Sequence, residues 1–482
     1  DTIYHPSGEA ISGAGSYIAE ELTPSPSIPS FDDSVWEAKM ADWNTRIDNA
    51  GANVSGTSRS EGSGTLNLSS NVNWSGQTLS YRNINTNGYD ITGTNWTVKC
   101  RYFNLESGSE ISSGASNFHI ECTREFTMTD AQINASNYTI DCRDLVMNGS
   151  SQINSSGNTI TSNRDVIMND TAQIVNSDTI NITDDFTMND SSQISADSLT
   201  INCLDIFRMN DSSQISADNI TVNVNDDFLV YNDTSITSDN FNISIWDNFD
   251  TDGNFNLSGY GYIACSNNNG NIILHSEDSN SGTFTATPSG GSIYFLSGGS
   301  MTINSTDSDT NVILNNGCVL YSRNPSSDDD LLRIRNDNTA IDGAEIIAER
   351  RIIIQSSADI MDSFIFLDRA GGDSNNYLEI TDSGTTVEGT IISMGRDSPS
   401  LDIRDSAAIT GFVYQYDGVG SRGYARIDGD STITGSLYIY EMYNNSFGPA
   451  SITYDADSLP AAWDGFTFPG AVGMQSGTWD GL

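Results

Sequence analysis

The sequence predicts an all-β fold, a parallel β-solenoid (β-helix) of coils about 20 residues long with a short N-terminal capping helix. Two residue markers repeat with one period: Gln-Ile pairs recur at intervals of 20, 21, 20 and 21 residues, and methionines at 19, 21, 20 and 21. The pairs begin at Gln132, Gln152, Gln173, Gln193 and Gln214, and the methionines are Met128, Met147, Met168, Met188 and Met209. Two independent markers with one period indicate stacked coils.

Within each repeat the side chains alternate with a period of two. Ile140 with Cys142, and then Leu145 with Met147, fall on one face of successive short segments, which predicts strands. Each segment is followed by Asn, Gly, Asp or Ser, the residues that turn a chain. A unit with three strands and three corners is one coil of a right-handed or left-handed solenoid. The predicted inward column pairs Val98 with Cys100, Ile120 with Cys122, Ile160 with Ser162, Ile180 with Ile182, Ile201 with Cys203, Val222 with Val224 and Ile243 with Ile245.

The repeat divides the chain into four predicted parts. Residues 59–257 form the regular solenoid, and residues 258–458 continue it with longer loops because the period loosens while strand patterns persist. A leucine-rich consensus is missing and the period is not a multiple of six, so a generic β-helix fits better than leucine-rich or hexapeptide solenoids.

The two ends differ from the repeat. Residues 1–58 are an N-terminal extension in which Ser34 and Glu37 form a capping box before apolar residues at helical spacing, so we expect a helix that covers an open strand edge. Residues 459–482 form an apolar C-terminal cap or docking tail. The predicted assembly residues at the two ends are Trp36, Trp43, Trp463, Phe466, Phe468 and Trp479.

The charge excludes two classes of partner. The chain of 482 residues has 64 acids, 20 bases and a net charge of −44, so nucleic acid and anionic membrane surfaces are poor partners. Only Lys39 and Lys99 are lysines, so the acids require Arg, cations or salt for compensation. No apolar stretch has the length of a membrane span, and Asp1 opens no signal pattern, so we expect a mature or truncated chain.

Acidic residues follow the repeat in columns. Stacked like charges repel by about 1 kcal/mol per pair in water, and Ca²⁺, which takes six to eight oxygen ligands, would offset that repulsion. The alternative is a solvated acidic surface in saline surroundings. The candidate metal column is Asp170, Asp190, Asp211 and Asp233; a second column is Asp144, Asp165, Asp185 and Asp205, and a third is Asp178, Asp197, Asp218 and Asp239.

Uncharged columns have a structural interpretation. An asparagine column precedes the corner acids and predicts a hydrogen-bonded ladder along the stack. Its members are Asn148, Asn169, Asn189, Asn210 and Asn232. Cys100, Cys122 and Cys142 share an inward column; buried free thiols are favoured over a disulfide because parallel side-chain directions disfavour the bridge.

A catalytic role has one candidate residue. The DTDG stretch at 250–253 resembles the NTDG motif of the polygalacturonase family, which implies Asp252 as an acid. That family's Gly-His-Gly and Arg-Ile-Lys motifs are missing, and carboxylate pairs occur everywhere in so acidic a chain. The sequence therefore predicts that the protein is not an enzyme and has no assigned catalytic residue.

A resemblance covers about 50 residues near the C-terminus. The segment from Ala408 to Asp455, with Ile-x-Gly turns at Ile409 and Ile433 and an ITYD ending, resembles β-solenoid surface proteins associated with type IV pilin-like systems and is similar to bactofilin coils. The resemblance implies a surface-displayed, non-enzymatic role. The apolar pilin helix expected upstream is missing from this sequence.

Together these observations predict an extracellular or cell-surface structural protein. We expect a rigid acidic β-solenoid that serves as a filament or appendage subunit, or as a surface stalk, by end-to-end self-association. The alternatives are a carbohydrate-binding adhesin or polysaccharide-active β-helix enzyme, with surface glycans as partners, and a calcium-dependent surface-layer component.

Overall fold

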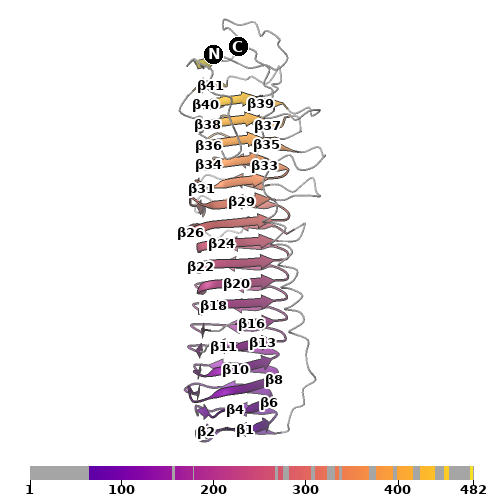
Figure 1. The fold of residues 1–482 in the computed structure, drawn as a ribbon, viewed down its shortest axis with the longest axis vertical. Helices are drawn as coiled ribbons and strands as arrows, with labels where there is room; N and C mark the ends of the chain where they lie inside the picture. Colours follow the sequence, from indigo (N-terminus) through magenta and orange to yellow (C-terminus); the bar gives the residue numbers. More distant parts are fainter. Residues whose placement is uncertain are drawn as a thin grey trace. The chain divides into compact units, whose positions relative to one another are not determined.

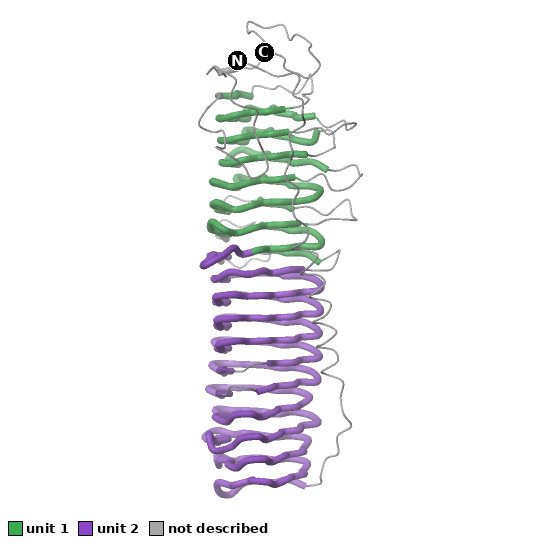
Figure 2. The backbone as a smooth tube through the Cα atoms, viewed as in Figure 1, with its two compact units in different colours: residues 1–35, 267–283, 294–482 green, residues 36–266, 284–293 purple. Residues whose placement is uncertain are grey.

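The computed structural model describes residues 64–154, 158–176, 179–265, 270–274, 282–304, 310–322, 332–335, 339–367, 376–394, 399–415, 424–439, 450–454 and 478–480. Every helix or strand in these residues is a β-strand. The helix predicted after Ser34 lies outside the described residues. The chain divides into two compact units: unit 2 is Trp36–Ser266 with Phe284–Ile293, and unit 1 holds the remainder (Figure 2).

Unit 2 contains strands β1 to β24 and the central part of β26. These are β1 (Thr65–Asn67), β2 (Val72–Asn73), β3 (Thr78–Ser80), β4 (Asn83–Asn85), β5 (Ile91–Thr92), β6 (Thr97–Leu105), β7 (Glu110–Ile111), β8 (Ser116–Thr129), β9 (Gln132–Ile133), β10 (Ser136–Cys142), β11 (Asp144–Asn148), β12 (Gln152–Asn154), β13 (Thr159–Ser162), β14 (Val166–Met168), β15 (Gln173–Val175), β16 (Thr179–Ile182), β17 (Phe186–Met188), β18 (Gln193–Cys203), β19 (Phe207–Met209), β20 (Gln214–Val224), β21 (Phe228–Tyr231), β22 (Thr234–Ile245), β23 (Phe249–Asp252), β24 (Phe255–Cys265) and β26 (Gly282–Ser297).

Unit 1 contains the remaining strands. These are β25 (Ile272–Leu274), β27 (Met301–Asn304), β28 (Thr310–Leu314), β29 (Cys318–Ser322), β30 (Leu332–Arg335), β31 (Thr339–Asp342), β32 (Glu345–Ala348), β33 (Arg351–Gln355), β34 (Asp359–Leu367), β35 (Tyr377–Ile380), β36 (Thr386–Ser393), β37 (Leu401–Ile403), β38 (Ala408–Gln415), β39 (Ala425–Ile427), β40 (Thr432–Ile439), β41 (Ser451–Tyr454) and β42 (Thr478–Asp480).

Unit 2 is a parallel β-solenoid, as the sequence predicts. A coil contains three strand segments, and each segment pairs in parallel with the segment one coil further on, as β12, β13 and β14 pair with β15, β16 and β17 (Figure 1). The register places Gln152 opposite Gln173 and Gln173 opposite Gln193, so the Gln-Ile markers stack. The same side-chain types therefore recur at the same place in successive coils.

Unit 1 repeats this parallel pairing with wider spacing along the chain. Ile352 lies opposite Leu378, Leu378 opposite Leu401, and Leu401 opposite Ala425, which are separations of 26, 23 and 24 residues by subtraction. The extra residues lie between the paired strands, where the register does not constrain their number. The loosened period that the sequence shows after residue 257 thus accompanies continued parallel pairing.

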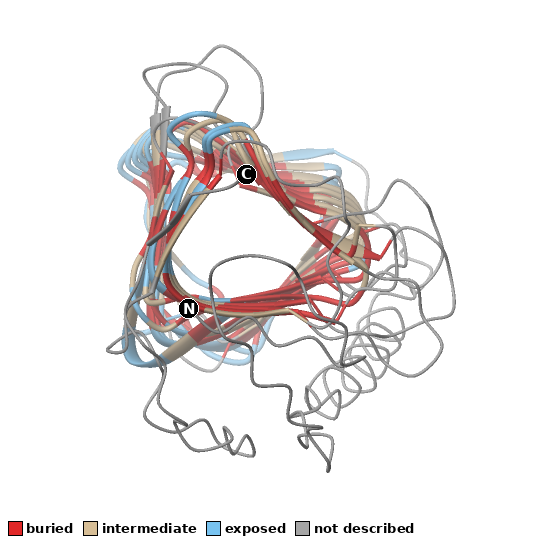
Figure 3. Ribbon diagram, turned by 90° about the horizontal axis from the view of Figure 1, so that it is seen from above, coloured by how far each residue is buried: buried red, intermediate tan, exposed pale blue. Residues whose placement is uncertain are grey.

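Buried residues recur along the strands of the described coils (Figure 3), and their apolar side chains form the core. In unit 2 the rings of Phe186, Phe207 and Phe228 stack, with centroids 4.8 Å and 4.6 Å apart, and all three side chains are fully buried. Burying a phenylalanine side chain contributes about 1.5–3 kcal/mol. The same column continues with Val166 and Leu145 in the two preceding coils, so apolar burial stabilises the stack coil by coil.

Stacked glycines make one corner of unit 1. Gly411 and Gly435, from the two Ile-x-Gly turns, have φ of 132° and 145°. A Cβ at Gly411 would lie 2.0 Å from the carbonyl oxygen of Gly389, and one at Gly435 would lie 1.9 Å from that of Gly411. Only glycine allows both this backbone conformation and the close approach of successive coils.

The last described strand covers one edge of unit 1. Strand β42 pairs antiparallel with β41, placing Trp479 opposite Ile452 in the register, whereas β41 pairs in parallel with β40 on its other side. This pairing gives β41 a partner on both sides, so its edge is not available to another strand.

Candidate functional site

The predicted metal column is a set of corner residues whose carboxylates bind backbone groups. Asp170 and Asp190 have φ near 60°. Asp170 Oδ2 accepts a hydrogen bond from the Gly149 N–H at 2.9 Å, and Asp190 Oδ2 accepts one from the Asp170 N–H at 3.0 Å. Each carboxylate thus holds the corner of the preceding coil.

The other two members of that predicted column have amide partners. Asp211 Oδ1 accepts a hydrogen bond from Asn232 Nδ2 at 3.2 Å, and Asp233 Oδ1 accepts one from Asn254 Nδ2. Met209 lies opposite Val230, which places Asn232 in the column after Asp211 and moves Asp233 one residue out of register. Among the described residues, the four carboxylates do not form a metal-binding group.

The predicted asparagine ladder is confirmed over four of its five members. Asn169 Nδ2 donates to Asn148 Oδ1, Asn189 Nδ2 to Asn169 Oδ1, and Asn210 Nδ2 to Asn189 Oδ1, each at 2.8 Å. The prediction is wrong for Asn232, because the register places Tyr231 above Asn210. Three further ladders on unit 2 join Asn67, Asn85 and Asn104; Asn134 and Asn154; and Asn181, Asn202 and Asn223.

Closely spaced carboxylates occur at a different corner of unit 2. In each coil the corner residue lies two positions before the first inward residue of the following strand. We call these residues the corner column, and along the stack their charge changes from positive to negative. Its members are Arg124, Arg143, Arg164, Asp184, Asp205, Asp226 and Asp247. We call the first three the arginine segment and the last four the aspartate segment.

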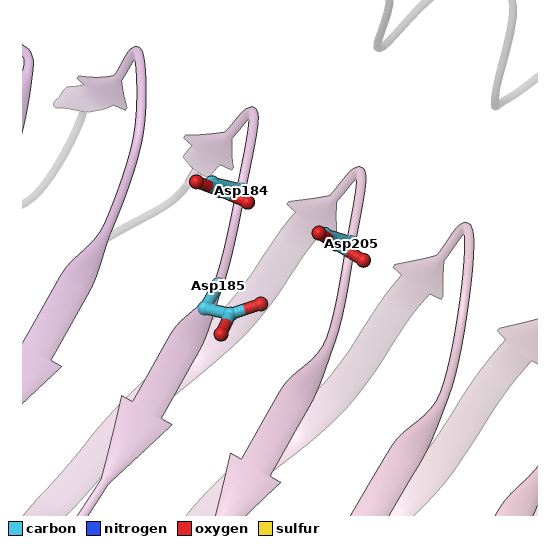
Figure 4. A group of neighbouring side chains, drawn as sticks. All are labelled: Asp184, Asp185 and Asp205. Atoms are coloured by element: carbon cyan, nitrogen blue, oxygen red, sulfur yellow. The ribbon is translucent and has the colours of Figure 1, made fainter.

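Two groups in the aspartate segment have the proximity of a metal site. Asp184, Asp185 and Asp205 place one carboxylate oxygen each within 4.8 Å of one another. Figure 4 shows Asp184 and Asp205 in successive bends, with Asp185 at the start of the strand that follows the first bend. The second group, Asp226, Asp227 and Asp247, meets the same limit. Carboxylate oxygens suit Ca²⁺, and all six side chains are partly exposed.

The carboxylates beside the aspartate segment have partners from the protein. Asp185 Oδ1 accepts the Ile206 N–H at 3.2 Å, and Asp185 Oδ2 lies 2.6 Å from Arg208 Nη1. Asp227 Oδ1 accepts both the N–H and the Nδ2 of Asn248, at 3.1 Å and 2.9 Å. These interactions fix the neighbouring carboxylates and leave the members of the aspartate segment facing one another.

Burial, and then the neighbouring carboxylates, make the carboxyl groups of the aspartate segment hard to ionise. Burial is the largest cause that raises the pKa of Asp184, Asp205, Asp226 and Asp247. Neighbouring carboxylates raise these pKa values further, Asp185 for Asp184 and Asp227 for Asp226 and Asp247. A carboxyl group close to like charge favours its neutral form. The segment is therefore suited to taking up protons or cations.

The arginine segment has the opposite chemistry. Arg164 Nε lies 2.7 Å from Asp144 Oδ1 and 2.9 Å from Asp165 Oδ2, so one guanidinium joins carboxylates from two coils. Burial raises the pKa of Asp165, and the positive charge of Arg164 opposes that rise. The negative charges of Asp144 and Asp165 are therefore neutralised by a side chain of the protein itself.

The second acidic column of the sequence analysis corresponds partly to this corner. Asp144, Asp165 and Asp185 do share a column, but Ile206 and not Asp205 follows Asp185, because Phe186 lies opposite Phe207. The 20-residue spacing that grouped Asp205 with them was wrong by one residue. The signal that identifies the corner is a strict 21-residue spacing of Asp184, Asp205, Asp226 and Asp247.

The remaining predicted residues lie apart from this corner column. Cys100 and Cys122 stack as predicted, with Sγ atoms 3.2 Å apart and no disulfide between them, and Cys142 is buried and outside any disulfide. Asp252, on β23, is buried with 5% of its surface exposed. Of the predicted assembly residues, Trp479 belongs to β42. The others, Trp36, Trp43, Trp463, Phe466 and Phe468, lie outside the described residues, as does Asp178 of the third acidic column.

Comparisons of the chain with family models, with curated proteins and with solved structures gave no match. In the described part of the chain there is no helix of the length and hydrophobicity needed to cross a bilayer. The repeated side-chain contacts between coils and the corner column are therefore the features from which a function can be proposed.

Proposed function

We propose that the protein is an extracellular or cell-surface structural protein, an acidic β-solenoid that serves as a filament or appendage subunit or as a surface stalk. The observation that supports the proposal is that the same side-chain contact recurs in successive coils. The ladder from Asn148 to Asn210 has three links of 2.8 Å, one between each pair of coils. Such repetition distributes stability along a stack, as expected of a scaffold.

The charge of the chain supports an extracellular, saline setting for this scaffold. With a net charge of −44, copies repel one another unless salt or cations screen the acids. The aspartate segment concentrates this repulsion within unit 2. The sequence predicts Ca²⁺ at the column that contains Asp190. The groups around Asp205 and Asp226 are a better candidate for bound Ca²⁺, because their carboxylate oxygens lie close together.

Negative-stain electron microscopy of the full chain over a range of concentrations tests the proposal. We expect particles to join end to end into linear assemblies as concentration rises at moderate salt. Particles of one protomer length at the highest concentration would contradict the filament proposal.

A carbohydrate-binding adhesin is the second candidate, and exposed aromatic side chains favour it. Trp246 and Tyr260 in unit 2 are each 38% exposed, and flat rings of this kind stack on sugars. Tyr262, on the same strand as Tyr260, is 5% exposed and is a poor candidate. Binding of neutral and acidic glycans to the parent chain and to W246A/Y260A, with a reducing-end assay for cleavage, separates an adhesin from a polysaccharide-active enzyme and from a scaffold.

A further inference from the structure

The corner column of unit 2 continues toward the N-terminus with two further arginines. The pairing of β6 with β8 places Arg101 beside the bulge that contains Arg124. The N–H of Arg101 donates to the carbonyl oxygen of Arg82 at 2.9 Å. Five successive coils therefore have an arginine at this corner, and we call this set the arginine column: Arg82, Arg101, Arg124, Arg143 and Arg164. Of the 20 basic residues in the chain, these five lie in one line.

Four members of the arginine column have no carboxylate partner among the described residues. The described arginines that form ion pairs are Arg164, Arg208, Arg404 and Arg426. Arg82 and Arg124 are exposed, and Arg101 and Arg143 are half-buried. The Nε atom of Arg101 is buried and has no hydrogen-bond partner within the described structure. In a chain with 64 acids, four guanidinium groups in a line are thus left available to an external anion.

Stacking makes the arginine column a line of like charge. Coils stack about 4.8 Å apart, and two unit charges at that spacing repel by about 1 kcal/mol in water. A carboxyl group relieves such repulsion by taking up a proton, but a guanidinium stays charged at every physiological pH. An anion that follows the column would therefore offset a repulsion that the protein itself does not relieve.

The side chains beside the arginine column change along the stack. The residues that follow the five arginines are, in order, Asn83, Tyr102, Glu125, Asp144 and Asp165. Glu125 Oε1 accepts the Thr127 hydroxyl at 2.6 Å, and Asp144 is held by Arg164. The first two coils thus have uncharged neighbours, and the guanidinium of Arg101 lies 5.6 Å from the ring centroid of Tyr102. Acids border the column only in the later coils, where they leave room for a thin anionic chain but oppose a broad anionic surface.

We propose that the arginine column binds a linear acidic polysaccharide, whose successive anionic groups lie against the four guanidinium groups that have no carboxylate partner. A guanidinium presents a planar fork of donors that matches an oxyanion. The ring of Tyr102 gives one sugar a flat apolar face on which to stack. The inference rests on the extracellular setting of the proposed function, and it names the class of glycan that the scaffold would hold.

Nucleic acid fits the arginine column less well. Duplex DNA carries a charge about every 1.7 Å along its axis, a density that one arginine per coil does not match and that Glu125 and Asp144 oppose. Single strands are held by rings that stack on successive bases, and the five residues beside the column include one ring, that of Tyr102. The column is therefore better suited to a chain with widely spaced charges.

Isothermal titration calorimetry of the full chain at low salt tests the site with four probes. These are oligogalacturonate, which has carboxylates, dextran sulfate, neutral dextran and oligo(dT). We expect the two acidic glycans to bind, with an affinity that falls as NaCl is added, and neutral dextran not to bind. The ratio of the two affinities distinguishes carboxylate from sulfate as the preferred group. Failure of both acidic glycans to bind overturns the proposal, and so does binding of oligo(dT) as tight as theirs.

Double variants then test whether the arginine column is the binding site. R82Q/R101Q removes the two arginines with uncharged neighbours, and we expect the affinity for the acidic glycans to fall about tenfold or more. R124Q/R143Q tests the adjoining coils independently, with the same expectation, and thermal melts verify that each variant is folded. The control R208Q/R333Q removes two arginines outside the column and should bind like the parent. Unchanged affinity in both column variants, or equal losses in all three proteins, overturns the proposal.

Electron microscopy of the same samples separates this inference from the proposed function. Linear assemblies of a parent chain that binds no acidic glycan would overturn the inference and leave the filament proposal standing. Particles of one protomer length that bind acidic glycans through the arginine column would contradict the filament proposal and support the inference.

Discussion

The arginine and aspartate segments of unit 2 occupy the same corner of successive coils but differ in how the acidic side chains there are compensated. In the first, Arg164 neutralises Asp144 and Asp165 from two coils. In the second, Asp184 stands where an arginine would be, and the next three coils repeat the aspartate. The backbone accepts either side chain, so the fold does not determine the charge of this corner.

The difference shows that negative charge in this solenoid is neutralised only where an arginine lies within the same or an adjacent coil. Asp185 obtains a guanidinium from Arg208, 2.6 Å away, but Asp205 is flanked in its column by two further aspartates. Stacked coils lie about 4.8 Å apart, so an uncompensated column repeats its repulsion at every step. Removing a charge from each segment therefore tests how much the charges at this corner contribute to the free energy of unfolding.

Removing the arginine has the largest expected effect. Arg164→Gln leaves Asp144, which is 9% exposed, and Asp165 without their shared cation, and we expect a loss of about 2 kcal/mol in the free energy of unfolding. Urea unfolding at neutral pH measures it. Arg164→Lys keeps the charge and should recover part of the loss. An equal loss in both variants would assign the effect to packing of the side chain instead of charge.

Removing a central aspartate should have the opposite sign. Asp205→Asn eliminates repulsion with Asp184 and Asp226 and supplies an amide that can link into a ladder, so we expect a gain of about 1 kcal/mol. Asp197→Asn is the control, because it makes the same charge change at an exposed residue of the same coil. Equal gains in the two variants would indicate relief of overall charge and not of the corner.

The sequence predicts the fold because inward residues repeat strictly. The stacking of Met147, Met168 and Met188 needs only the period and the alternation, and the register confirms it. Side-chain ladders follow from the same register, which is why the asparagine ladder is correct as far as Asn210. It fails at Asn232 because Asn232 lies 22 residues after Asn210, whereas the register advances by 21, and a shift of one residue turns a side chain to the other face.

The same shift explains why the candidate site was identified incompletely. Counting in steps of 20 placed Asp205 beneath Asp185, although it belongs beneath Asp184. A corner residue has no alternating pattern to fix its register, so its neighbours in the stack follow only from the pairing of the strands on either side. The partners of a carboxylate, such as the Ile206 N–H on Asp185, are set by the backbone of the bend and have no signature in the sequence.

The stability of the protein should depend on pH through the aspartate segment. The pKa values of Asp184, Asp205, Asp226 and Asp247 are raised in the folded state above the ordinary value of 3.8, so the folded protein binds protons more tightly than the unfolded chain. This contribution to stability is complete below pH 3.8 and is lost as the pH rises through the raised values. We expect unfolding free energies measured from about pH 4 to about pH 7 to fall less steeply in D184N/D205N/D226N/D247N than in the parent.

A pH-matched control completes that comparison. D170N/D190N/D211N/D233N removes the same number of carboxylates from unit 2, away from the aspartate segment. If both quadruple variants flatten the pH dependence equally, the raised pKa values of the aspartate segment are not its source.

The smallest expected effect on stability is that of added Ca²⁺. It distinguishes an aspartate segment that binds cations from one whose carboxyl groups take up protons. If Ca²⁺ binds the groups around Asp205 and Asp226, a concentration equal to its Kd stabilises the folded chain by about 0.4 kcal/mol. The melting temperature should then rise at neutral pH more than in a NaCl solution of equal ionic strength, and chelation should reverse it. The gain should disappear in D205N/D226N, because each three-carboxylate group loses one ligand, and persist in D170N/D190N. A rise that NaCl reproduces in all three proteins would assign the effect to screening of the net charge of −44, leaving protons as the occupants of the corner.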